Sequence, residues 1–340
     1  MPNPTLADLG WSVDFARQVT PDETPARVCA IHRDRIEALA PSGLLTLRCR
    51  DTGLLTVGDW VVHDGASVTR VLERLSLLHR RAAGIAARDQ LLAANVETLG
   101  IVTSCNADFN TARLERYLAR ALASGALPLV ILTKADLVPD PEAFRRKAER
   151  LSPLVTALTL DATDPEDAAR LAPWCRAGQT LALLGSSGVG KTTLQNALTG
   201  TDEATKGIRE DDAKGRHTTA ARAMRATLYG GWLIDTPGMR ELALAGAEAG
   251  IDAVFDDVAD LAARCRFSDC RHAAEPGCAV QAAIAAGTLD PARLARWEKL
   301  KREDRHNRES LHEAHVRERR TDRSYAGDRA RIAQKRRGWE

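Results

Sequence analysis

The segment Gly185–Thr192 reads GSSGVGKT and matches the phosphate-loop pattern GxxxxGK[ST]. It follows the apolar run Thr180–Leu184, which predicts a buried strand, and precedes a helical stretch over Lys191–Leu198. Glycines at these positions let backbone N–H groups turn inward and bind phosphate at a helix N-terminus. Lysine is scarce in this chain, at eight of 340 residues, so a chance match is rarer than usual. The loop therefore predicts a nucleoside-triphosphate site.

The phosphate loop assigns specific roles to its last residues. Lys191 is expected to reach the β- and γ-phosphates and to act in catalysis, and the Thr192 hydroxyl is expected to bind Mg²⁺. The expected phosphate-binding residues are Gly185, Ser186, Ser187, Gly188, Val189, Gly190, Lys191, Thr192 and Thr193.

The tetrapeptide Thr133, Lys134, Ala135, Asp136 ends the apolar run Leu127–Thr133 and resembles the [NT]KxD base-recognition motif of GTPases. A carboxylate at Asp136 can accept hydrogen bonds from N1–H and the exocyclic amine of guanine, whereas adenine offers neither donor in that arrangement. Thr133 replaces the commoner Asn, which we expect to weaken the contact to the guanine edge. The motif favours GTP and disfavours an ATP-dependent kinase or ATPase.

Two further segments complete a GTPase set. Asp235 follows the apolar Trp232–Ile234 and begins the sequence DTPG, so its carboxylate is expected at a strand end near Mg²⁺, and the Gly238 N–H near the γ-phosphate. The sequence GRHTT at 215–219 suits a switch loop. Its expected ligand-binding residues are Thr218 and Thr219, the latter also a magnesium ligand.

The residue that positions the attacking water is not obvious. Met239 follows DTPG, where many GTPases carry a glutamine, and a thioether cannot orient water. His217 in the threonine switch is the nearest candidate for this catalytic role. The alternatives for His217 are a backbone-packing role or a contact to a partner, and a group on the partner could then position the water. We therefore expect slow turnover in the absence of a partner.

The rest of the chain divides into regions that differ in their hydrophobic pattern. Residues 1 to about 25 show no period and predict a loose leader. Short β-like stretches over Arg27–Ile31, Leu44–Arg48, Asp59–His63 and Ser67–Leu72 predict a barrel of about five strands, with Trp60 in its core. After Arg81, apolar strands alternate with helices, which indicates a doubly wound parallel sheet. Beyond Ala245 the chain is expected to be helical.

Seven cysteines include three within a 14-residue stretch that also holds a histidine. Cys265, Cys270, His272 and Cys278 offer three thiolates and one imidazole, a complete tetrahedral set for one structural zinc ion. The other four cysteines are expected to be core residues: Cys29, Cys49, Cys105 and Cys175.

The base motif precedes the phosphate loop, the threonine switch and DTPG, which is a rotated order for a GTPase. A circular permutation explains it, because domain termini usually lie close together. In the order and the sequences of its motifs, the chain resembles the RsgA (YjeQ) family of small-subunit-dependent, circularly permuted GTPases. The resemblance rests on VGDWV, NADFN, TKAD, GSSGVGKTT, KGRHTT, IDTPGMREL and CRFSDCRHAAEPGCAV.

The resemblance implies a multidomain α/β architecture: an OB-fold RNA-binding domain over 1–80, a permuted GTPase domain over 81–245, and a zinc-binding domain with a basic helical tail over 246–340. It also implies hydrolysis of GTP to GDP, stimulated by the small ribosomal subunit and its rRNA, in late maturation of that subunit. The alternatives are a GTP-switched RNA-binding module with negligible turnover, and a GTPase acting on a different RNA or translation partner.

Charge and hydropathy set the remaining expectations. The formal net charge is only +2, but from Lys299 to Glu340 there are 14 Lys and Arg against 8 Asp and Glu. This tail is expected to be a charged helix that adds sequence-independent affinity for the subunit; the alternative is a solvated charged helix with no such role. The longest apolar runs fall short of the roughly 18 residues of a membrane helix, and the start lacks the pattern of a secretory signal. We expect a cytoplasmic monomer with no membrane partner.

Overall fold

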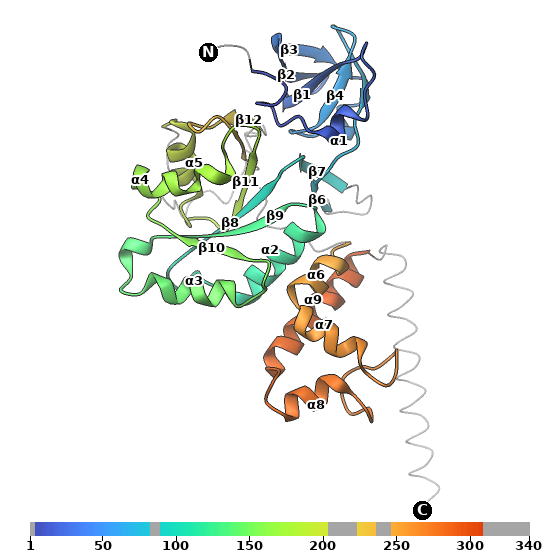
Figure 1. Ribbon diagram of the computed structural model, residues 1–340, viewed down its shortest axis with the longest axis vertical. Coiled ribbons are helices and arrows are strands. Elements are labelled where there is room, and N and C mark those ends of the chain that lie inside the picture. The colour runs from blue at the N-terminus through green and yellow to red at the C-terminus, as the bar shows by residue number, and fades with distance from the viewer. Residues whose placement is uncertain (1–3, 82–88, 203–222, 236–245, 309–340) are drawn as a thin grey trace, which may run out of the picture.

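The computed structural model describes residues 4–81, 89–202, 223–235 and 246–308. A five-stranded β-barrel, a central sheet with its helices and a set of C-terminal helices follow one another along the long axis of the molecule (Figure 1). This arrangement confirms the expected order of a β region, an α/β region and a helical region that holds the cysteines.

The barrel is built from five strands, as the sequence predicts. Strand β1 pairs antiparallel with both β2 and β4, and a parallel bridge between Arg48 and Ser67 brings the ends of β3 and β5 together. Trp60 is fully buried, which confirms its expected place in the core. The strand that sequence analysis missed is β2. The strands are β1 (Thr24–Ile31), β2 (Arg35–Ala40), β3 (Gly43–Arg48), β4 (Trp60–His63) and β5 (Val68–Val71).

The expectation of a loose leader is wrong for the part of it that the structure describes. A short helix, α1 (Val13–Ala16), carries Phe15 into the core, where it is 1% exposed. The Trp11 ring lies 4.7 Å from the Trp60 ring in an edge-to-face arrangement, a geometry that aromatic pairs favour. The prolines that suggested a loose chain lie on either side of this aromatic cluster.

The central sheet is parallel except at one strand. Its order is β10-β9-β8-β11-β13-β12, and β12 runs antiparallel to β13, so the expectation of a wholly parallel sheet is corrected there. Beyond β12, one residue pair, Ala30 with Ala223, joins this sheet to β1 of the barrel. The strands are β8 (Thr98–Ser104), β9 (Leu127–Thr133), β10 (Thr156–Thr159), β11 (Thr180–Gly185), β12 (Ala223–Ala226) and β13 (Trp232–Asp235).

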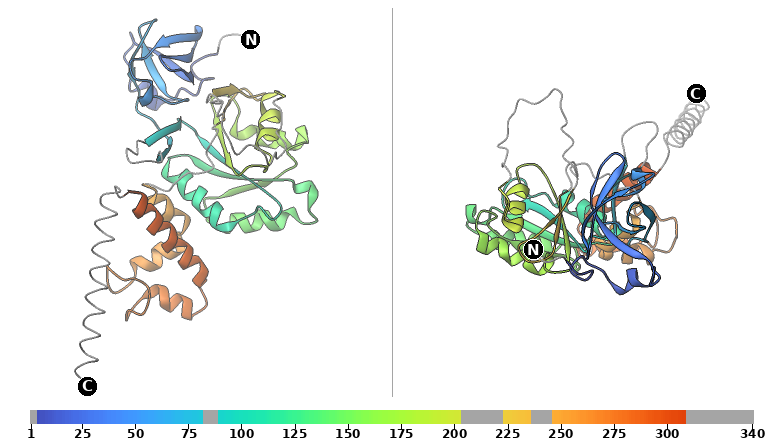
Figure 2. Two further views of the ribbon diagram at one scale, coloured as in Figure 1. Left: turned by 180° about the vertical axis from the view of Figure 1, so that it is seen from behind. Right: turned by 90° about the horizontal axis from the view of Figure 1, so that it is seen from above.

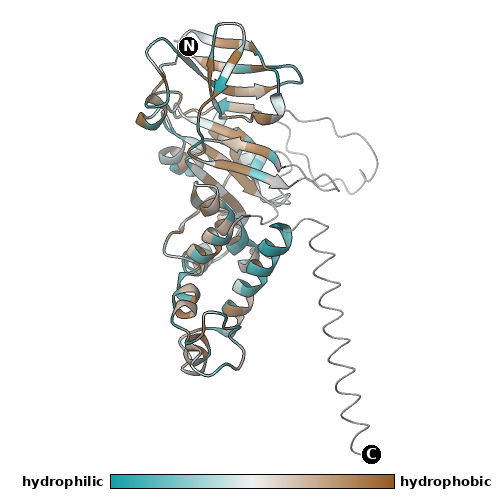
Figure 3. Cartoon of the chain, turned by 90° about the vertical axis from the view of Figure 1, so that its right-hand side faces the viewer, coloured by the Kyte–Doolittle hydropathy of each residue, from teal (hydrophilic) through white to brown (hydrophobic). Residues whose placement is uncertain are grey.

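Helices cover both faces of the central sheet. Ile101 of β8 shares one buried cluster with Leu114 of α2 (Thr111–Ala123), on the side that also carries α3 (Pro141–Glu149). Its neighbour Val102 belongs to a second buried cluster with Leu194 of α5 (Lys191–Thr199). Successive strand residues point to opposite faces, so both faces are apolar and the strands are mostly hydrophobic (Figure 3). A short helix, α4 (Pro165–Ala168), precedes β11 in the chain.

A hairpin links the barrel to the sheet. Strands β6 (Leu77–Arg81) and β7 (Asp89–Ala94) pair with each other, and Gly58 of the barrel approaches the backbone of Ala94 so closely that a Cβ would lie 2.0 Å from the Ala94 oxygen. The buried Arg27 guanidinium donates to the carbonyls of Gly58 and Asn95. Barrel and sheet therefore meet in a packed junction.

The C-terminal helices pack against α2 at the end of the molecule opposite the barrel (Figure 2). The charged helix expected from Lys299 begins earlier, at Pro291, and is described as far as Arg308; the tail over 309–340 lies outside the described residues. No helix in the described ranges is both long and apolar enough to cross a membrane. The helices are α6 (Glu248–Val254), α7 (Asp256–Ala263), α8 (Ala279–Ala285) and α9 (Pro291–Arg308).

Candidate nucleotide site and metal cluster

The phosphate loop has the backbone that its glycines predict. Gly188 and Gly190 have φ of +76° and +89°, a region that L side chains rarely adopt. At Gly185, a Cβ would lie 2.2 Å from the carbonyl oxygen of Val102 on β8, so only glycine allows this approach. Lys191 begins α5, and its ammonium donates to the carbonyls of Gly185, at 2.7 Å, and of Ser186. The Lys191 side chain therefore folds back onto the first residues of the loop, at the N-terminus of α5.

The base motif lies against this loop. The Thr133 hydroxyl oxygen is 2.6 Å from the carbonyl oxygen of Val189 and 3.1 Å from that of Thr103. The Lys134 ammonium donates to the carbonyl of Gly188 at 2.9 Å. Strands β9 and β11 are parallel members of one sheet, so their carboxyl ends deliver the two motifs to the same edge. The structure thus brings together the base motif and the phosphate loop, although their order in this chain is the reverse of that in an unpermuted GTPase.

A pocket of about 230 Å³ opens between the two motifs, lined by Asp136, Gly190 and Thr193 among others. Asp161, Ala162 and Thr163, which follow β10, also line it. Sequence reasoning missed this third segment. The only sequence signal for residues 161–163 is that they follow the short strand TALT, and neither segment carries a recognisable motif. Asp136 is exposed, and among the described residues no hydrogen bond to its carboxylate is found.

The remaining expected ligands divide into two groups. Asp235 ends β13, in parallel register with Leu183 of β11, and so lies at the same sheet edge as the phosphate loop. Thr192 is in the first turn of α5. These two oxygen donors suit Mg²⁺. His217, Thr218, Thr219 and Gly238 lie outside the described residues.

The four expected metal ligands converge. Their ligand atoms all lie within 4.8 Å of one another, with the sulfurs of Cys265 and Cys278 3.8 Å apart and each 3.6 Å from Nδ1 of His272. Ligands at about 2.3 Å from a tetrahedral ion are separated by about 3.8 Å. His272 adopts a left-handed backbone conformation, φ 57°, and its carbonyl accepts a hydrogen bond from Gln281. The loop is shaped to hold one metal ion.

The other cysteines are mostly core residues, as expected. Burial raises the pKa of Cys29, Cys105 and Cys175 to about 11, so these thiols stay protonated and unreactive near neutral pH. Cys49 differs because it is only half-buried.

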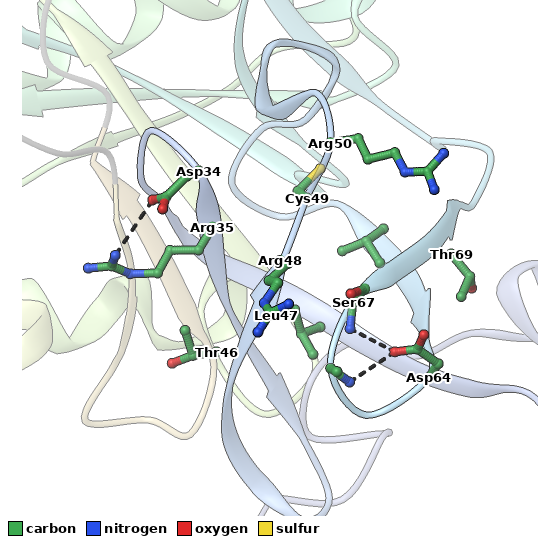
Figure 4. Close-up of a pocket in the computed structure, with 12 residues that line it drawn as sticks. Asp34, Arg35, Thr46, Leu47, Arg48, Cys49, Arg50, Asp64, Ser67 and Thr69 are labelled. Carbon is green, nitrogen blue, oxygen red and sulfur yellow. Dashed lines mark hydrogen bonds and ion pairs between the residues drawn. The ribbon is translucent and has the colours of Figure 1, made fainter.

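A wide groove of about 1110 Å³ lies on the barrel, far along the chain from the nucleotide motifs (Figure 4). It carries three arginines, Arg35, Arg48 and Arg50. Asp34 pairs with Arg35 at 3.5 Å, and the Asp64 carboxylate accepts from the backbone N–H of Ser67 at 2.7 Å. The acids of this groove are thus engaged locally.

Strands, phosphate loop and base motif together define a class: a GTPase whose motifs are circularly permuted. The sequence model of the family described as RsgA GTPase matches residues 71–245. The small ribosomal subunit biogenesis GTPase RsgA of Mesorhizobium japonicum is 51% identical over 317 residues, covering 90% of this chain and 91% of that protein. RsgA 2 of Vibrio parahaemolyticus is 46% identical, covering 91% and 88%.

Two solved structures share the fold. The crystal structure of YjeQ from Thermotoga maritima has a TM-score of 0.60 at 22% identity, covering 82% of this chain and 97% of that one. YloQ, described as a circularly permuted GTPase, has a TM-score of 0.60 at 21% identity, covering 85% and 97%. The chain belongs to the RsgA family of small ribosomal subunit biogenesis GTPases.

Proposed function

We propose that this chain binds Mg²⁺–GTP at the shared edge of β9, β11 and β13 and hydrolyses it when docked on the small ribosomal subunit. The observation that carries the assignment is the pair of contacts from Thr133 and Lys134 to the backbone of the phosphate loop. They support one site made from both motifs, with guanine in the pocket beside Asp136 and the phosphates over Gly185–Lys191.

The residues have separate tasks in this proposal. Asp136 accepts the guanine donors, the phosphate-loop N–H groups and Lys191 bind the phosphates, and Thr192 and Asp235 hold the magnesium ion. Magnesium supplies charge neutralisation at the β- and γ-phosphates. His217 remains the proposed water-positioning residue, and Thr218, Thr219 and Gly238 the proposed γ-phosphate and magnesium contacts.

We propose zinc as the occupant of the Cys265, Cys270, His272 and Cys278 cluster. Three thiolates and one imidazole match its preferred ligands, and four protein ligands leave no open position for catalysis. The ion therefore has a structural role.

The partner contacts are proposed for the barrel and the C-terminal region. Arg35, Arg48 and Arg50 line the barrel groove. The five-stranded arrangement of the barrel is also that of the OB-fold, whose strands and loops bind oligonucleotides. With Trp60 buried, few aromatics are left in the barrel for stacking, so we expect backbone contacts to rRNA there. We propose domains over 1–80, 81–245 and 246–340, a monomer, and a cytoplasmic location alongside the subunit.

The test is phosphate release from GTP by the full chain, alone and with purified small subunits. We expect slow release alone and at least about tenfold stimulation by the subunit. Lys191→Ala should abolish both, and excess GDP but not ATP should compete. Subunit binding without stimulated release would instead identify a GTP-switched binding module.

A further inference from the structure

A second pocket, of about 290 Å³, lies where the metal-binding loop meets α6, α7 and α9. Phe267 and the ligands Cys270 and His272 form its loop side; Trp297 and Lys301 of α9 and Asp252 of α6 form the helical side. It is separate in sequence and in lining residues from the nucleotide pocket.

Phe267 is unusual in this protein. It is 42% exposed, and every other aromatic side chain in the described part of the chain is buried or half-buried. Its position is fixed on both sides: it lies between the ligands Cys265 and Cys270, the Cys270 N–H donates to its carbonyl at 3.3 Å, and the Arg266 N–H donates to Gly277 at 3.1 Å. The loop therefore presents one phenyl ring to solvent from a braced backbone, which lowers the ordering cost of a contact.

The loop around this ring carries a small excess of positive charge, three arginines against the two acids Asp269 and Glu275. The Arg266 guanidinium carbon lies 5.5 Å from the Phe267 ring centroid, and Arg264 and Arg271 are exposed on the same loop. The nearby acids are largely engaged: the Glu275 carboxylate accepts from the N–H groups of Arg271, Ala273 and Ala274. Asp269 is exposed.

Across the pocket, the Asp252 carboxylate accepts from Trp297 Nε1 at 3.1 Å and from Lys301 at 2.8 Å. The Lys301 ammonium also lies 5.2 Å from the Trp297 ring centroid. The tryptophan is thus fixed in the wall by its own neighbours, which leaves Phe267 as the ring available to a ligand.

We propose that Phe267 stacks on an unpaired base of the small-subunit rRNA, with Arg264, Arg266 and Arg271 facing the flanking phosphates. A single exposed ring among arginines matches a ligand that carries both a flat π-face and negative charge. A double helix presents no free base face to such a ring. This inference rests on the proposed function, because it takes the RNA from the subunit partner.

The test compares four substitutions in the full chain loaded with a non-hydrolysable GTP analogue, three at Phe267 and one control. Dissociation constants for purified small subunits are measured at several salt concentrations. Loss of one base-stacking contact should weaken binding about 5- to 150-fold in Phe267→Ala, and Phe267→Tyr should stay within about twofold of wild type. Leu154→Ala, which truncates a residue 54% exposed on the GTPase core, is the matched control and should leave binding unchanged.

Phe267→Leu separates RNA from protein as the occupant. Leucine keeps an apolar side chain but offers no aromatic face, so it should bind as weakly as Phe267→Ala; wild-type affinity in Phe267→Leu would indicate an aliphatic protein contact and overturn the proposal. Metal content and GTP binding of each variant verify the fold. A wild type that fails to bind the subunit would overturn the proposed function, whereas unchanged binding by Phe267→Ala alone would overturn only this inference.

Discussion

Two carboxylates, Asp136 and Asp161, line the nucleotide pocket. Asp161 accepts from the N–H and the hydroxyl of Thr163, so the exposed Asp136 is the group best placed to select the base. We predict that Asp136→Asn exchanges guanine for xanthine specificity. The asparagine amide would oppose the exocyclic amine of guanine, donor against donor, but would donate to the carbonyl oxygen that xanthine carries there. GTP affinity should fall by at least about a hundredfold, and xanthosine triphosphate should bind.

Titration calorimetry with GDP and xanthosine diphosphate measures both changes. The matched control is Asp22→Asn, another exposed aspartate in the N-terminal segment, which should leave GDP binding unaltered. If Asp136→Asn retained GDP affinity, the base would be recognised elsewhere, and Asp161, which lines the same pocket, would be the next candidate.

At the scale of single elements, the cysteines of the metal-binding loop and the buried cysteines should be protected from alkylation for different reasons. At pH 8, a thiol with a pKa near 11 is only about 0.1% thiolate, so Cys29, Cys105 and Cys175 should resist alkylation in the folded chain. The three loop cysteines are protected instead by the bound ion. We predict that Cys49 alone reacts quickly, that a chelator adds three reactive thiols, and that denaturant adds the last three.

Mass spectrometry of the alkylated chain counts these steps. Because a buried thiol has a raised pKa, the reactivity of Cys29, Cys105 and Cys175 should rise as the pH approaches 11. Three additional fast thiols without chelator would argue against a bound metal.

Sequence analysis anticipated the elements that carry long apolar runs or motifs, and missed those that do not. LPLVILT at β9 and TLALL at β11 are continuous apolar stretches, typical of strands buried on both faces. RIEALA at β2 and TALT at β10 are short and mixed, so their strand character comes from pairing with neighbours. Without β10, the pocket wall at Asp161–Thr163 had no position in the fold. The hydrogen bond from Thr133 to Val189 could not be predicted for a different reason: it joins two segments that lie far apart in the sequence.

At the scale of the whole molecule, the C-terminal helices are fastened to the GTPase core by a buried charge cluster. Glu115 of α2 is fully buried and bonds to Arg296 at 2.8 Å and to Arg293 at 3.4 Å, both on α9. Burial raises the pKa of the Glu115 carboxyl, while the Arg296 hydrogen bond opposes this. Close by, a Cβ on Gly250 of α6 would lie 2.1 Å from the Ala119 carbonyl oxygen of α2. Helices this close have no room to slide freely.

We predict that Glu115→Ala lowers the free energy of unfolding by about 3 kcal/mol, because the half-buried Arg296 loses its carboxylate and Arg293 keeps only that of Asp257. The control is Glu149→Ala, which breaks a half-buried pair with Arg145 within the single helix α3 and should cost about 1 kcal/mol or less. Urea denaturation followed by tryptophan fluorescence measures both. Equal effects of the two substitutions would show that the cluster does not fasten the domains.

The fastened interface also bears on how nucleotide state is communicated to the partner. Asp235 and α6 are joined by residues 236–247, so the switch that we propose after Asp235 is continuous in sequence with the C-terminal helices. A switch can displace that domain only by as much free energy as its contacts differ between GTP and GDP, and any displacement must break the Glu115 cluster. We predict that the C-terminal helices move with α2 as one body. The ratio of subunit affinities with a GTP analogue and with GDP should then be the same, within about twofold, in wild type and in Glu115→Gln, whose neutral amide weakens the cluster. A ratio about tenfold larger in the variant would show that the cluster restrains a domain that the nucleotide tends to displace.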